Sequence, residues 1–151
     1  MLIQATYDDA NLILRLFELR REEKLRKARE WFAANFAPTS LEDMQRIAPV
    51  GSQENAYMRM VVSYWDMAAS FVTAGVLNQE LFFQSSGELL FVWERVRPLV
   101  SALRAFNKNP NSWRNLETVG NAAIKRMEAG SPEAYPAFQQ MVHGAAWPKQ
   151  G

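Results

Sequence analysis

The sequence contains no cysteine and only one histidine, His143. Without thiols there can be no disulfide, no thiolate nucleophile and no cysteine-based metal site, which suits a reducing compartment and leads us to expect a cytoplasmic protein. The chain also has no histidine pair and no Glu-x-x-His motif for a metal, and no glycine-rich phosphate motif. We therefore expect no metal site and no cofactor.

Long apolar runs are missing as well. The longest uncharged run, residues 134–148, is interrupted by prolines, glutamines and a glycine, and the run over residues 67–79 is too short to cross a membrane. The first residues lack the basic and then apolar order of a signal peptide. The net charge of +1 gives no general attraction to nucleic acid or anionic lipid. We expect no transmembrane segment and no specific nucleic-acid partner.

Residues suited to catalysis are few. His143 lies in a proline-interrupted C-terminal segment, where an ordinary tail histidine is a simpler interpretation than a Ser–His–Asp triad. Two carboxylates for glycoside hydrolysis could come from the set Asp66, Glu80, Glu88, Glu94 and Glu117, but the spacing of these residues in the sequence does not favour such a pair. The sequence favours a non-enzymatic protein and identifies no catalytic residue.

What the chain does have is enough apolar surface for a core. Of its 151 residues 48% are hydrophobic, and no segment alternates with the period of two that strands require. We expect one all-α domain over residues 1–151, an irregular bundle of five or six helices with a long N-terminal helix. Residues after about 144 are expected to form an irregular tail.

The expected centre of the bundle is a pair of helices over residues 53–74 and 86–106. In the first, polar residues occur in one narrow stripe at steps of four, three, four and three, so most of its surface should be buried. The stripe consists of Arg59, Ser63, Asp66, Ser70 and Thr73.

The N-terminal helix is expected to begin at Asp8 or Asp9 and to run to about Ala34. Its middle, residues 20–27, is charged except for Leu25, and pairs four residues apart, Glu22–Arg26 and Glu23–Lys27, should support it. An exposed Leu25 with Trp31 nearby would offer a contact for a second copy. Basic residues outnumber acids over residues 15–29, which gives a weak argument for nucleic-acid binding.

Joints between helices carry their own signals. We expect Ser40 and Asn78 to cap helices, and Gly75 to end a helix in a left-handed conformation. Pro98 should break a helix, and Gly120 should lie where two helices come close together. At residues 85–88 two interpretations stay open: a new helix starting with a Ser85–Glu88 capping box, or one helix continuing through Gly87. A short last helix should end near Gly144.

Charged residues within the apolar centre form the only candidate binding site. If the polar stripes of the two central helices face each other, they make a polar seam, in which a carboxylate needs a partner such as arginine. The alternatives are two solvated faces or ion pairs that fix the helix register. The seam comprises Arg59, Asp66, Glu94, Arg97, Arg104 and Glu117.

Two stretches also resemble a known family. Trp93, Pro98 and Arg104, followed by Trp113 and Glu117, resemble the pattern of an uncharacterised bacterial family of small helical domains of unknown function. An acidic residue and a glycine of that family correspond to Asp66 and Gly75, and the resemblance covers about residues 8–127. It implies a helical fold and no assigned activity. Many relatives carry an N-terminal membrane helix, from which this chain departs.

These observations favour a non-catalytic interaction or scaffold domain, which could pair with itself or with another protein. The alternative is a domain that binds a small ligand, or acts on one, in the polar seam. A third interpretation is weak nucleic-acid binding through the basic first helix.

Overall fold

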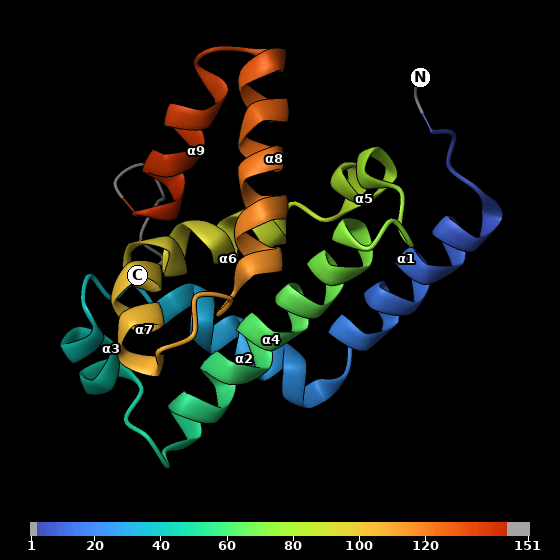
Figure 1. Ribbon diagram of the computed structural model, residues 1–151. Helices are drawn as coiled ribbons and strands as arrows, with labels where there is room; N and C mark the ends of the chain where they lie inside the picture. Colours follow the sequence, from blue (N-terminus) through green and yellow to red (C-terminus); the bar gives the residue numbers. More distant parts are fainter. Residues whose placement is uncertain (1–2, 145–151) are drawn as a thin grey trace.

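The computed structural model describes residues 3–144, in which every regular element is helical (Figure 1). The all-α prediction is confirmed, with more helical segments than the five or six expected. In chain order the elements are α1 (Tyr7–Arg20), α2 (Glu23–Asn35), α3 (Leu41–Ile47), α4 (Gln53–Thr73), α5 (Gln79–Ser85), α6 (Glu88–Val96), the 3₁₀ turn η1 (Arg97–Leu99), α7 (Val100–Asn107), α8 (Arg114–Gly130) and α9 (Ala134–Val142).

Helix α4 is the centre of the arrangement. It runs diagonally across the molecule in Figure 1, and its most extensive contacts are with α2 and α8. Helix α6 packs against α8, and α9 folds back beside α8 and α6. Of the polar stripe expected from the sequence, Arg59 and Ser63 are exposed, whereas Asp66 is half-buried and bonds the start of α8, and Thr73 bonds Asn115 of the same helix.

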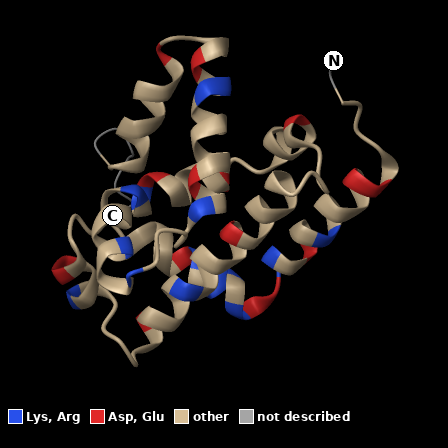
Figure 2. Ribbon diagram, in the orientation of Figure 1, with Lys and Arg blue, Asp and Glu red and all other residues tan. Residues whose placement is uncertain are grey.

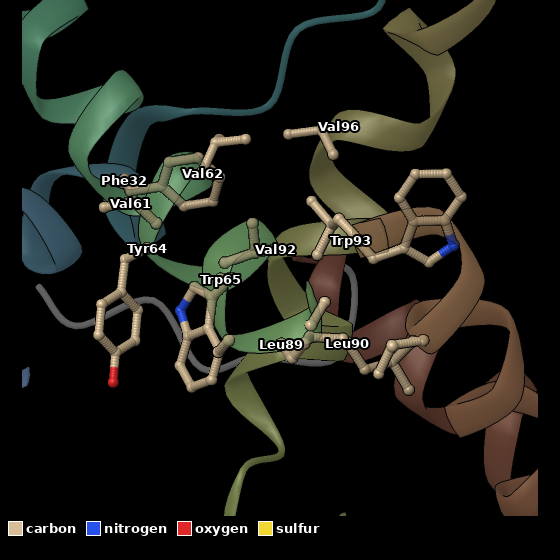
Figure 3. Close-up of a cluster of buried hydrophobic side chains, with 14 of the residues drawn as sticks. Phe32, Val61, Val62, Tyr64, Trp65, Leu89, Leu90, Val92, Trp93 and Val96 are labelled. Carbon is tan, nitrogen blue, oxygen red and sulfur yellow. The ribbon is translucent and has the colours of Figure 1, made fainter. Parts of the chain in front are cut away.

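The core lies where α2, α4 and α6 meet (Figure 3). Trp65 of α4, Phe32 of α2 and Val92 of α6 are almost fully buried there, and the buried ring of Phe82 on α5 lies 6.5 Å from that of Trp65. The predicted burial of the helix over residues 53–74 is confirmed. Burying large aromatic and aliphatic side chains from separate helices is the main stabilising contribution in such a bundle.

The long N-terminal helix is the expectation that the structure corrects. The helix ends at Arg20 and a second one starts at Glu23, because the Glu22 carboxylate accepts hydrogen bonds from the backbone amides of Lys24 and Leu25, both at 3.1 Å. The same glutamate was expected to pair with Arg26 within a continuous helix. The break turns Leu25 inward, where it is only 8% exposed, so it offers no contact to a second copy.

Most of the other joints are as predicted. Ser40 and Asn78 cap α3 and α5, Gly75 has a left-handed backbone with φ of 78°, and Pro98 lies in the 3₁₀ turn between α6 and α7. At residues 85–88 a new helix does begin, but without the capping box. Gly87 is the N-cap residue and has no side chain to offer, while Glu88 bonds elsewhere.

Candidate functional site

The six residues predicted to form a polar seam lie in separate places. Asp66 contacts the start of α8, Arg104 and Glu117 join α7 to α8, and Glu94 with Arg97 faces α9. Arg59 instead bonds within α4. The two stripes therefore do not meet as one continuous seam.

Asp66 acts as a helix cap from a distance. Its Oδ1 accepts a hydrogen bond of 2.9 Å from the backbone amide of Leu116, in the first turn of α8. The residue before that helix, Trp113, has a left-handed backbone with φ of 56° and makes no capping bond itself. A carboxylate at this end also favours the positive pole of the helix dipole.

Arg104 and Glu117 form a half-buried ion pair. Nη2 of Arg104 lies 3.2 Å from Oε1 of Glu117, and its Nε donates to the carbonyl of Ser112 at 3.0 Å. Arg114 reaches the same carboxylate oxygen at 2.9 Å. These contacts hold the loop between α7 and α8 in place, and the Glu117 carboxylate is paired with both arginines.

Among the charged residues that the structure describes, Glu94 is the most deeply buried, with only 1% of its surface exposed. It accepts hydrogen bonds from Arg97 at 2.9 Å and from the hydroxyl of Tyr135 on α9, and His143 Nε2 lies 3.8 Å away. Burial, followed by the hydrogen bond to Glu94, raises the pKa of Tyr135 to about 12. The cluster holds α9 against α6.

Two of the predicted site residues line a hollow on the outer face of α4. Its volume is about 490 Å³, and it is bounded by Ala56, Met58, Arg59, Met60, Val62, Ser63, Asp66 and Trp113. Arg59 donates through Nε to Asn55 at 3.0 Å, and its two terminal nitrogens have no partner among the described residues. Oδ2 of Asp66 likewise has none there. This hollow, called the α4 groove below, therefore presents one positive and one negative group.

A second cavity, of about 340 Å³, was not indicated by the sequence. It lies between α2, α4, α6 and α9 and is lined by Arg29, Phe32, Ala33, Val61, Gly87, Glu88, Phe91, Val92, Phe138 and Met141. Its charged pair, Arg29 and Glu88, is 59 residues apart in the chain. The only signal available to sequence reasoning was that Glu88 follows a glycine at a helix start, which suggested a local cap.

Charges of both signs are intermixed over α1 and α2 (Figure 2). Lys27 pairs with Glu23 at 3.3 Å and Arg29 pairs with Glu88, while the Arg20 guanidinium lies over the rings of Phe17 and Trp65. Several of the basic residues over 15–29 are thus engaged within the chain.

Within residues 3–144, no group of three His, Cys, Asp or Glu side chains is placed to hold a metal ion. Among the same residues, no helix is both long and apolar enough to cross a membrane.

Comparison with known proteins places the chain in a family. No curated protein and no solved structure matches it. Residues 5–123, which run from just before α1 into α8, match a family described as a domain of unknown function, DUF4760, and α9 lies outside the matched part. This chain is a member of that family of domains of unknown function, DUF4760.

Proposed function

We propose that the chain is a non-catalytic interaction domain that pairs with a second copy of itself through the α4 groove. The observation that carries the proposal is the presence, beside one hollow on α4, of an exposed arginine and a half-buried aspartate, each with polar atoms that have no partner among the described residues. The proposal includes the expected cytoplasmic location, which fractionation of producing cells would test.

The spacing of the two charges suits an antiparallel pair of helices. Arg59 and Asp66 are seven residues apart, about 10 Å along the helix and on the same face. A two-fold axis between Val62 and Ser63 brings Arg59 of each copy beside Asp66 of the other. Closed two-fold pairing of this kind uses the same patch twice, and a patch with both signs of charge is complementary to itself.

The surroundings of the two charges favour a helix contact. Ser63, at the centre, has a small side chain that lets two helix backbones approach closely, and Met60 and Met67 on either side are flexible apolar groups that adapt to a partner. Met67 is 40% exposed, which is high for a large apolar side chain. Burying these methionines would add to the free energy of association from the ion pairs, because exposed ion pairs contribute little on their own.

The first experiment measures molar mass by light scattering over a concentration series. The wild-type chain should approach twice its mass of 17.3 kDa. Arg59→Glu would place two carboxylates opposite each other at both ends of the contact, and we expect it to raise the dimer dissociation constant more than roughly tenfold. Arg15→Glu, the same charge change on an exposed position of α1, is the matched control and should dimerise normally.

The absence of cysteine allows a second test. Ser63→Cys places one thiol near the two-fold axis, so mild oxidation should link two copies through a single disulfide. Ser101→Cys, on an exposed position of α7, should link slowly if at all. A wild-type mass that stays at 17.3 kDa at every concentration, or equal cross-linking of the two variants, would contradict the proposal.

A further inference from the structure

The cavity between α2, α4, α6 and α9 has the shape and lining of a small-molecule site. Its floor is made of Phe32, Val61 and Val92, all nearly fully buried, and its side walls include Phe91 of α6. Helix α9 supplies the remaining wall through Phe138 and Met141. A volume of about 340 Å³ falls within the range of ligand pockets, which are mostly apolar with a few placed polar groups.

The walls are held in place by bonds that do not involve the cavity itself. The guanidinium of Arg95 lies 4.6 Å from the centre of the Phe91 ring and donates to the carbonyls of Phe36, at 2.7 Å, and Val142, at 2.8 Å. These bonds join the ends of α2 and α9. A ligand would therefore find a preformed cavity, which lowers the cost of ordering on binding.

The two charged side chains at the polar end of the cavity, Arg29 and Glu88, neutralise each other. Arg29 and Glu88 form a two-point ion pair, with Nε to Oε2 at 2.9 Å and Nη2 to Oε1 at 3.0 Å, and the indole of Trp65 donates to the same carboxylate at 3.0 Å. Nη1 of Arg29 donates to the carbonyl of Arg20 at 3.1 Å. A guanidinium has five N–H donors, so two remain for a ligand oxygen.

We propose that this cavity binds a small uncharged aromatic or alicyclic molecule carrying one oxygen acceptor. The apolar rings would lie against Phe91, Phe138 and Met141, and the oxygen would accept a hydrogen bond from Arg29. An anionic ligand is disfavoured, because Glu88 already neutralises the arginine and would repel a second carboxylate. A cationic ligand is disfavoured as well, because it would lie next to the guanidinium of Arg29.

A matched pair of probes tests the charge requirement. At pH 7, 2-naphthol is neutral and 2-naphthoate is an anion of the same ring system. Titration calorimetry should give saturable one-to-one binding of 2-naphthol, and affinity for 2-naphthoate should be weaker by roughly tenfold or more, corresponding to about 1.4 kcal/mol. Nuclear Overhauser contacts should join naphthol protons to the Met141 methyl and the Phe138 ring.

Variants of two neighbouring alanines locate the site. Ala33 lines the cavity and Ala34 does not, although both are exposed on α2. Ala33→Phe should fill the cavity and abolish naphthol binding, whereas Ala34→Phe should bind as the wild type does. Circular dichroism should show that both variants are folded.

Several results would overturn the proposal. They are an unsaturable titration, equal affinity for the two probes, full binding by Ala33→Phe, or Overhauser contacts to side chains outside the cavity. The Overhauser measurement needs no variant, so it decides the matter even if Ala33→Phe fails to fold. None of these results depends on the oligomeric state, so the self-association proposed above is tested separately.

Discussion

Gly120 of α8 lies directly against the indole ring of Trp93 on α6. A Cβ atom built at Gly120 would come within 2.5 Å of Cδ1 and 2.6 Å of Cγ of that ring. Trp93 is buried and cannot swing away without disturbing its neighbours. Glycine at this position sets how closely the two helices approach.

Gly120→Ala should therefore destabilise the protein. Alanine favours a helix over glycine by about 1 kcal/mol, but overpacking a filled core costs about 1–3 kcal/mol, so we expect a net loss in the free energy of unfolding. Urea titration measures it. Gly130→Ala is the control, because no atom beyond its chain neighbours and its own helix backbone lies within 4 Å of its Cβ position, and it should be neutral or stabilising. A stable Gly120→Ala would mean that the helices can separate at little cost.

Removal of the Asp66 carboxylate should loosen the start of α8. Asp66→Ala leaves the Leu116 amide without its partner, and loss of a capping acceptor costs about 1 kcal/mol. Urea titration should show that loss, and hydrogen exchange should show faster exchange at Leu116. Ser101→Ala, on an exposed position of α7 away from the α4 groove, should leave both measurements unchanged.

Replacement of Arg95 by lysine should release α9. A single ammonium cannot keep the fixed pattern of bonds that the guanidinium makes to Phe36 and Val142. We expect a loss of about 1–3 kcal/mol in unfolding free energy and faster amide exchange confined mainly to α9. Arg46→Lys, in an exposed ion pair with Asp43, should change stability by less than about 0.5 kcal/mol. Unchanged exchange in α9 would rule out this role for Arg95.

Alkaline pH should weaken the fold through Tyr64. Its hydroxyl donates to the carbonyl of Leu16 at 2.5 Å, and burial raises its pKa from 10.0 to about 12. Between these values the folded chain keeps a proton that the unfolded chain has released, so stability falls as the pH rises from 10 to 12. Tyr64→Phe loses the hydrogen bond at pH 8 but should show a shallower decline above pH 10. Parallel declines in urea titrations of the two proteins would contradict the assigned cause.

Local signals in the sequence predicted most of the helix ends. These signals act through a residue's own backbone or through residues within one turn, so they can be recognised from the sequence alone. They are Ser40, Gly75, Asn78 and Pro98. Gly120 was identified because glycine weakens a helix unless a neighbour requires its small size. The burial of the helix over residues 53–74 followed from its narrow polar stripe.

Predictions failed where two interactions competed. The Glu22 side chain could support a continuous helix by pairing with Arg26 or end one by accepting backbone amides, and both patterns fit the same residues. Glu88 fits a local capping box, yet it bonds Arg29 and Trp65 from distant helices. The cavity beside it depends on the packing of four helices, which no local spacing encodes.

The position of α9 has a consequence for how this fold can change. The cavity floor comes from residues inside the region matched to the family, but Phe138 and Met141 come from α9, which lies beyond it. Helix α9 packs against α8 and α6 and is bonded to α6 through Glu94, Arg95 and their partners. Phe138 and Met141 are only partly buried, so these two side chains can vary with little repacking of the core. Evolution could thus alter which molecules enter the cavity by substitutions in one terminal helix, while the family's shared scaffold stays unchanged.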